Sequence, residues 1–204
     1  VTGPDLAVAL HEAGGLGVLH RFATVDEQAA WAREATDRGA RVAGAVGIAE
    51  DSLDRTAALL DAGADAVVVD VAHGHMEACL DAVAAIRDEF DPVLIAGNVA
   101  TPEGVADLAA AGADCVKVGI GPGSHCTTRR VAGAGVPQLT AVSDCAAAAE
   151  RHGVTTVADG GIRSSGDAAK ALVAGANAVM LGSMFAGSKE APGAVVEVDG
   201  ERYK

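Results

Sequence analysis

Three stretches of this chain repeat one pattern, and the repetition restricts the fold more strongly than any other feature. Each carries Ala-Gly-Ala at the end of a helix-like segment and continues into an apolar run, over residues 62–70, 111–119 and 174–182. A glycine that follows a helix commonly ends it, because glycine adopts positive φ without steric cost. Repeated helix-to-strand joints predict successive strand–helix units and therefore a parallel sheet.

Seven short apolar runs supply the expected strands. They are nearly continuous hydrophobic stretches, as expected for strands that are buried on both faces. The runs are Leu16–Leu19, Val42–Val46, Ala66–Val69, Val93–Ala96, Cys115–Val118, Thr155–Ala158 and Ala178–Leu181. Alanine-rich helical segments are expected between them, over residues 25–38, 51–62, 75–89, 102–111, 139–151 and 166–174.

A closed βα-barrel needs eight strand–helix units, one more than these runs provide. The fold class we expect is therefore α/β, an incomplete (β/α)8 TIM barrel whose first strand and last long helix lie outside residues 1–204. An open doubly wound sheet is the alternative, but no GxGxxG motif follows a first strand. No proline-rich linker or low-complexity tract divides the chain, so we expect a single domain.

Composition and charge exclude several classes of function. The 204 residues include 15 Lys+Arg and 28 Asp+Glu, and the net charge of −13 disfavours nucleic acid or an anionic membrane as partner. No apolar run approaches the roughly 18 residues of a membrane span, and no secretory signal is visible. The four cysteines form neither a CxxC pair nor a zinc pattern, so we expect reduced thiols and a cytoplasmic location. The acidity suits either a high-salt cytoplasm or an ordinary acidic protein from a GC-rich genome.

Two loops that follow the last two apolar runs predict a phosphate site. Asp159-Gly160-Gly161 follows the sixth run, and Gly182-Ser183 follows the seventh. Glycines let backbone N–H groups approach an anion closely, and TIM barrels often bind phosphate after their last two strands. The alternative is that these glycines only form tight turns.

A third loop, residues 119–129, predicts a reactive thiol. Its three glycines make the backbone permissive, and the free carbonyls of such a loop could bind a monovalent cation. Cys126 lies in this polar loop, and Arg129 and Arg130 follow closely, which should favour the thiolate. We therefore expect Cys126 to be a nucleophile, against the alternative of a buried, inert cysteine. The other three cysteines are expected in the core or in helices.

The same loop carries a resemblance to a known family. Gly119-Ile-Gly-Pro-Gly-Ser-His-Cys-Thr-Thr-Arg129 resembles the catalytic loop of the IMP dehydrogenase/GMP reductase family. The other loops of the family are matched in the same order by residues 69–75, 96–101, 158–163 and 180–183. The resemblance covers essentially the whole chain. His125 departs from it, because the family usually has an aliphatic residue at this position.

The resemblance implies covalent oxidoreductase chemistry on a purine nucleoside monophosphate. The thiolate of Cys126 would add to C2 of the purine, and Thr128 would help to activate the group that leaves or attacks. Hydride would pass between C2 and a nicotinamide cofactor. Division of a reaction into two easier steps through a covalent adduct is the general advantage of nucleophilic catalysis.

The resemblance also implies binding roles for the remaining loop residues. Asp159 would hold the ribose hydroxyls. The 5′-phosphate would be held by Ser124, Gly160, Gly161, Gly182 and Ser183. The nicotinamide side would be formed by Asp70, Asn98 and Gly119. Potassium would be bound by the carbonyls of Gly121, Gly123 and Cys126. Lys117, within a predicted strand, would either point to the cofactor or pair with an acid inside the barrel.

Two activities compete within the family. The dehydrogenase oxidises IMP to XMP with NAD, whereas the reductase converts GMP to IMP and ammonia with NADPH. Residues 130–138, 159–163 and 182–183 resemble dehydrogenases, but the absence of CBS modules after residues 16–24 is usual for reductases. We favour an NAD-dependent IMP dehydrogenase, formed as a homotetramer from a single catalytic domain without a CBS domain.

Hypotheses from other classes are a non-catalytic phosphate- or nucleotide-binding barrel fragment and a flavin-dependent barrel oxidoreductase. By the resemblance, a mobile flap that assists catalysis would follow residues 203–204. We therefore expect this chain alone to turn over poorly.

Overall fold

The computed structural model describes residues 2–204, apart from the side chains of residues 202 and 203. Helices and strands alternate along most of the chain. The helices are α1 (Pro4–Glu12), α2 (Val25–Asp37), α3 (Ser52–Asp61), α4 (Glu77–Glu89), α5 (Pro102–Ala110), α6 (Thr128–Val131), α7 (Gln138–His152), α8 (Ser165–Val173) and α9 (Ser183–Ala186). The strands are β1 (Gly17–Leu19), β2 (Val42–Val46), β3 (Ala66–Asp70), β4 (Val93–Val99), β5 (Cys115–Val118), β6 (Thr155–Asp159), β7 (Ala178–Met180), β8 (Val196–Val198) and β9 (Glu201–Tyr203).

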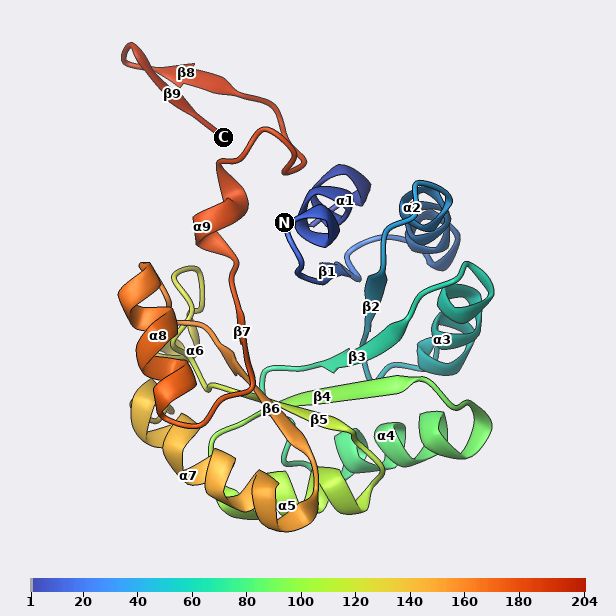
Figure 1. Cartoon of the computed structure of the whole chain (residues 1–204), viewed down its shortest axis with the longest axis vertical. Helices are drawn as coiled ribbons and strands as arrows, with labels where there is room; N and C mark the ends of the chain where they lie inside the picture. Colours follow the sequence, from blue (N-terminus) through green and yellow to red (C-terminus); the bar gives the residue numbers. More distant parts are fainter. Residues whose placement is uncertain (1) are drawn as a thin grey trace.

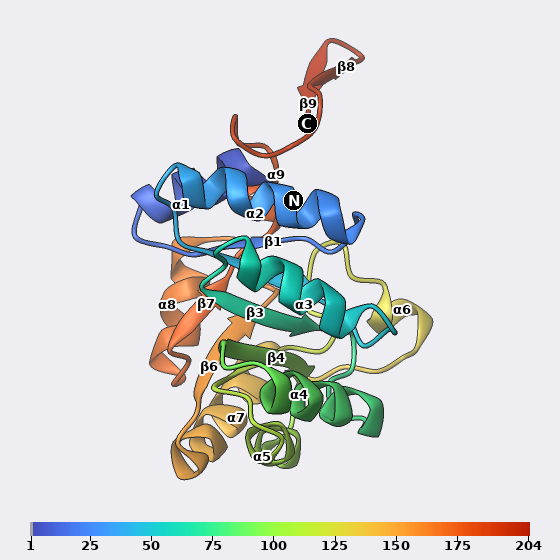
Figure 2. The ribbon, with the colours of Figure 1, turned by 90° about the vertical axis from the view of Figure 1, so that its right-hand side faces the viewer.

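Strands β1 to β7 form one seven-stranded sheet in sequence order, and every neighbouring pair is parallel. The sheet curls into an arc with helices on its outer side, and β1 and β7 are its two edges (Figure 1). The side view shows α2, α3 and α4 one below another over this outer side (Figure 2). A curled parallel sheet of seven strands confirms the predicted incomplete TIM barrel.

The predicted boundaries agree closely with the observed ones. Strand ends match to within one residue, except that β4 continues three residues further, to Val99, and helix ends match to within two residues. Helix α5 begins at Pro102 after Thr101, whose Oγ1 accepts a capping hydrogen bond from the Gly104 N–H at 3.2 Å. Asp51 precedes α3, but its side chain makes no cap hydrogen bond and pairs with Arg55 instead.

The sequence analysis did not predict α6, α9 or the antiparallel hairpin of β8 and β9. The two helices have four residues each, which is too short for a helical hydrophobic period to be visible. The hairpin turn is Asp199-Gly200, and both residues have positive φ, of 53° and 80°. An Asp-Gly turn between two strands is a recognised sequence signal for a hairpin.

Two apolar clusters lie on the two faces of the sheet. The larger one contains buried side chains from helices as well as strands, such as Leu59, Ile86 and Leu108, so it fills the outer layer between the helices and the sheet. The smaller one contains strand residues only and marks the inner face. Its buried members are Ala43, Ala66, Val68, Ile95 and Cys115, with Val18 and Val157 packed against them.

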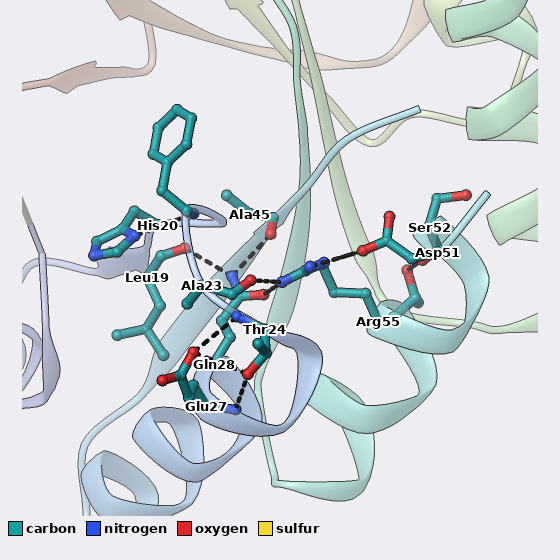
Figure 3. A network of polar contacts seen from close by, with 12 residues as sticks. Leu19, His20, Ala23, Thr24, Glu27, Gln28, Ala45, Asp51, Ser52 and Arg55 are labelled. Atoms are coloured by element: carbon teal, nitrogen blue, oxygen red, sulfur yellow. Dashed lines mark hydrogen bonds and ion pairs between the residues drawn. The ribbon is translucent and has the colours of Figure 1, made fainter. Parts of the chain in front are cut away.

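A buried polar network ties the ends of β1 and β2 to α2 and α3 (Figure 3). Gln28 is fully buried, and its Nε2 donates to the carbonyls of Leu19 at 3.2 Å and Ala45 at 2.8 Å. Arg55 donates from Nη1 to Gln28 Oε1 at 2.8 Å and from Nη2 to Asp51 Oδ2 at 2.7 Å. The network therefore fixes the chain that leaves β1 against its neighbour strand.

In a parallel barrel-type sheet, the carboxyl ends of all strands meet at one rim, where active sites are built. Figure 2 shows the segment that carries α6 on the side toward which the arrows of β3 and β4 point. The loop after β5 therefore lies at this carboxyl rim.

Candidate functional site

Strand alternation places three charged side chains on the inner face at the carboxyl rim. Val68 of β3, Cys115 of β5 and Val157 of β6 pack in the inner apolar cluster. Side chains alternate between the two faces of a sheet, so the residue two positions further along each strand faces the same way. These residues are Asp70, Lys117 and Asp159.

Lys117 joins the two carboxylates. Its side chain is only 2% exposed, and its Nζ pairs with Asp70 Oδ1 at 2.9 Å and with Asp159 Oδ2 at hydrogen-bonding distance. Burial on its own would lower the pKa of Lys117, but the charges and hydrogen bonds of Asp159 and Asp70 raise it overall. Of the two alternatives for Lys117, pairing with acids inside the barrel is the observed one.

Asn98 at the end of β4 belongs to the same cluster. Its Nδ2 donates to Asp159 Oδ2 at 2.9 Å and to the Gly119 carbonyl at 2.8 Å. The β4–β5 register shifts between Gly97 and Val99, and this irregularity lies at Asn98. The Asn98 Oδ1 atom is buried and has no hydrogen-bond partner among the described residues. Such an orphaned acceptor at a rim is suited to a ligand N–H or O–H.

Gln138, the last residue of the 130–138 segment, also belongs to the site, although no role was predicted for it. Its Nε2 donates to the Val118 carbonyl at 2.8 Å and to the Asp159 carbonyl at 3.2 Å, so it ties β5 and β6 together where they end. Its Oε1 is buried without a partner in the described part of the chain. The available signal was its place directly after Pro137, at the first residue of α7. Gly119 packs directly against the Gln138 side chain and the Asp159 carbonyl. A Cβ at Gly119 would collide with that carbonyl oxygen, so only glycine fits there.

The Cys126 thiol is exposed, as predicted for a nucleophile. Its Sγ lies 3.2 Å from Thr128 Oγ1. The hydroxyl of Thr128 and then its backbone N–H lower the pKa of Cys126, and the nearby charge of Arg129 adds a smaller effect in the same direction. The prediction that the arginines are the main cause of this effect is therefore wrong. Arg129 is instead mainly a loop brace, since its Nη2 donates to the Val136 carbonyl at 2.6 Å.

The other three cysteines are buried, in agreement with the expectation of core positions. Burial raises the pKa of Cys79 to about 11 and that of Cys145 to about 12, and it also raises the pKa of Cys115. Cys126 is therefore chemically distinct from the other thiols of this chain.

The structure brings the expected phosphate residues together. Ser124 Oγ, from the loop after β5, lies 3.3 Å from Ser183 Oγ, from the loop after β7. Gly160 and Gly161 have φ values of 92° and 78°, which favour glycine. A Cβ at Gly160 would lie 2.9 Å from the backbone nitrogen of Gly123, so two glycine-rich loops pack directly against each other.

The expected cation ligands are backbone carbonyls of the 119–129 loop. The Gly123 carbonyl accepts a hydrogen bond from the Cys126 N–H at 3.1 Å. A carbonyl oxygen has two lone pairs, so this bond leaves one for a cation. Among residues 2–204, no group of three or more His, Cys, Asp or Glu side chains could hold a metal ion.

Two further features lie outside this cluster. His75 Nε2 lies 2.7 Å from Asp107 Oδ2, which attaches the loop after β3 to α5 and gives His75 a structural contact. A groove of about 690 Å³ lies between α7 and α8, lined by Leu139, Ser143, Lys170 and Val173 among others, and it contains none of the expected site residues. Within the described residues, no helix is both long enough and apolar enough to cross a membrane.

Comparison with known proteins identifies the family. The family profile described as "IMP dehydrogenase / GMP reductase domain" matches residues 1–204. Proteins named inosine-5′-monophosphate dehydrogenase from Aquifex aeolicus (strain VF5) and Chlorobaculum parvum (strain DSM 263 / NCIMB 8327) are 58% and 56% identical over 165 residues, which is 80% of this chain. One from Streptococcus pyogenes is 58% identical over 164 residues. These matches cover 34%, 33% and 33% of the three relatives, so the chain spans about a third of their length. The chain belongs to the IMP dehydrogenase / GMP reductase family.

Proposed function

We propose that this chain forms the nucleotide-binding and thiol-bearing part of an NAD-dependent IMP dehydrogenase, which oxidises IMP to XMP. The observation that carries the proposal is the exposed Cys126 thiol of lowered pKa, in the loop that also brings Ser124 to Ser183. The choice of dehydrogenase over reductase is supported by relatives of 56–58% identity that are named inosine-5′-monophosphate dehydrogenase.

In the proposed reaction, Cys126 is the nucleophile. Its thiolate forms a bond to C2 of the hypoxanthine ring, which prepares C2 to give up its hydrogen as a hydride. NAD, when bound, supplies the hydride acceptor. Water then adds to C2 and the C2–S bond breaks, which releases XMP and restores the thiol. Overall, IMP, NAD and water give XMP, NADH and a proton. Thr128 stabilises the thiolate before the attack, consistent with its effect on the pKa of Cys126.

The remaining residues have proposed binding roles. Asp159 accepts hydrogen bonds from the ribose hydroxyls. The 5′-phosphate is held by Ser124, Gly160, Gly161, Gly182 and Ser183. These assignments are supported by the 3.3 Å contact between the two serine hydroxyls and by the positive φ of Gly160 and Gly161. Potassium is held by the carbonyls of Gly121, Gly123 and Cys126.

A nicotinamide carboxamide fits the other side of the cluster. The orphaned Asn98 Oδ1 would be satisfied by an amide N–H. The Asp70 side chain is 48% exposed, so one of its oxygens remains accessible beside Lys117. Gly119, whose carbonyl already receives Asn98 Nδ2, presents no side chain in this space. We therefore propose that Asp70, Asn98 and Gly119 hold the cofactor.

The first experiment follows nicotinamide absorbance in potassium buffer with two substrate pairs, using the protein that carries this chain. Formation of NADH from IMP and NAD, lost in Cys126→Ser and retained in Cys145→Ala, would support the proposal. Consumption of NADPH with GMP, with release of ammonia, would identify a reductase instead. No reaction with either pair, together with no alkylation of Cys126 by an electrophilic purine nucleotide, would favour a non-catalytic barrel.

We propose three further properties with this function. The protein is a homotetramer in the cytoplasm, and residues 1–204 belong to a single catalytic domain. Light scattering of the purified protein tests the oligomeric state.

A further inference from the structure

We propose that Lys117 is a positioning residue for two carboxylates. It holds one oxygen of Asp159 and one oxygen of Asp70. The second oxygen of each carboxylate is thereby kept at a fixed position, where it can accept a hydrogen bond from a ligand. Asp159 and Asp70 lie in the proposed ribose and nicotinamide sites, so the inference extends the function proposed above. Lys117 itself touches neither ligand in this proposal and acts through the two carboxylates.

The side-chain donors that contact the Asp159 carboxylate all reach the same oxygen. Lys117 Nζ and Asn98 Nδ2 both donate to Asp159 Oδ2. Asp159 Oδ1 receives no hydrogen bond from the described part of the chain, although the side chain is only 23% exposed. A carboxylate held through one oxygen by two donors has a fixed orientation, and its other oxygen is free to accept ligand hydroxyls.

Asp70 is held in the same manner. Lys117 Nζ pairs with Asp70 Oδ1 at 2.9 Å, and Oδ2 receives no donor from the described residues. An ammonium has three N–H donors, so Lys117 can serve both carboxylates at once. A single buried cation thus connects residues from β3 and β6, two strands that are not neighbours in the sheet.

The sheet register makes this bridge possible. Asp70 pairs with Gly97, and Gly97 pairs with Lys117, so the three residues lie in one row across β3, β4 and β5. A Cβ at Gly97 would lie 2.6 Å from Lys117 Cβ. The missing side chain at Gly97 therefore leaves the space in which Lys117 crosses toward β3.

Charge balance supports a role beyond packing. A buried ammonium needs compensation, and one carboxylate would supply it. Lys117 has two, both at the rim and both with an open oxygen. A cation that served only the core would have no need of a second carboxylate facing the opening.

The test compares binding of IMP with binding of its 2′,3′-dideoxy analogue by isothermal titration calorimetry. The unmodified protein is expected to prefer IMP by about 100-fold or more, because Asp159 accepts both ribose hydroxyls. Lys117→Met is expected to reduce this preference to near unity, and Gly97→Ala to reduce it in the same direction. Lys170→Met, which removes an exposed lysine paired with Asp167, should leave it unchanged. A folded Lys117→Met protein that keeps the full preference would overturn the proposal.

A second readout is independent of the nucleotide. Lys117→Met leaves the partly buried Asp159 carboxylate uncompensated, and the unfolding equilibrium constant is expected to rise by about 100-fold or more. Addition of Asp159→Asn removes that charge and should make the double variant more stable toward urea than Lys117→Met alone. If Lys117→Met does not fold, the double variant must fold. A double variant no more stable than the single one contradicts the bridge. Absence of IMP binding by the unmodified protein, with this stability pattern intact, would instead contradict the proposed function.

Discussion

Two buried cations, Arg55 and Lys117, have opposite relations to the opening of the curled sheet. The partners of Arg55 use their hydrogen-bonding atoms within the fold. Gln28 accepts a hydrogen bond from Arg55 and donates to two strand carbonyls (Figure 3). Lys117 lies between Asp70 and Asp159, each of which keeps one oxygen without a donor from the described residues. The arrangement around Arg55 therefore serves the stability of the fold, whereas the arrangement around Lys117 leaves two carboxylate oxygens that can accept hydrogen bonds from a ligand.

The difference can be seen in where the partners come from. The carboxylate of Arg55 is Asp51, four residues earlier and next to the same helix, so this ion pair is local. The carboxylates of Lys117 come from strands far apart in the sequence and meet only when the sheet has curled. We therefore expect substitutions around Arg55 to change stability alone, and substitutions of the two carboxylates held by Lys117 to change mainly ligand binding.

The largest effect is expected for Asp159→Asn. Each hydrogen bond from a ribose hydroxyl to a charged acceptor contributes about 1.5–3 kcal/mol, so loss of two weakens IMP binding by about 10²–10⁴-fold. Stability should change little, because Lys117 keeps Asp70 at 2.9 Å. Calorimetric titration with IMP measures the first effect, and urea unfolding measures the second. A strongly destabilised Asp159→Asn protein would contradict the view that the cluster around Lys117 serves binding while the cluster around Arg55 serves stability.

Arg55→Met tests the other cluster. The substitution leaves Gln28 Oε1 buried without its donor and removes the hydrogen bond to the Ala23 carbonyl. An unsatisfied buried acceptor costs about 1–3 kcal/mol, so we expect the free energy of unfolding to fall by about 2–3 kcal/mol. IMP affinity per folded molecule should stay unchanged, which calorimetry below the unfolding transition can check. A loss of affinity without a loss of stability would show that this network also serves the site.

Thr128→Val isolates the thiol from both clusters. Without the hydroxyl that lowers it, the pKa of Cys126 is expected to rise, so less thiolate is present at neutral pH. The rate of alkylation by iodoacetamide should therefore decrease at neutral pH, and its pH profile should move to higher pH. Thr127→Val is the matched control, because it removes a neighbouring hydroxyl that forms no hydrogen bond with Cys126 among the described residues. An unchanged pH profile for Thr128→Val would indicate that Arg129, and not Thr128, is the main cause of the lowered pKa of Cys126.

Much of this architecture follows from local sequence. Apolar runs and helix-ending glycines predicted every strand of the parallel sheet, because strands buried on both faces appear in the sequence as short continuous apolar runs. The rim loops were predicted from glycine, serine and cysteine content and from family resemblance. The bridge at Lys117 was not assigned, since it depends on strand register, and register is a property of the assembled sheet. Gln138 was missed for the same reason, because its partners are carbonyls at the ends of two other elements.

The smallest effect is expected for Asp51→Asn, and it refines the comparison further. Asp51 is 43% exposed, and an asparagine oxygen can still accept from Arg55, so stability should fall by only about 0–1 kcal/mol. The equivalent change at the rim, Asp159→Asn, removes a charge that the proposed ribose site uses. Urea unfolding in low and high salt measures the Asp51 effect, and any loss should shrink at high salt because the pair is partly solvated. A loss as large as that of Arg55→Met would mean that the Asp51 carboxylate, and not Gln28, holds Arg55 in place.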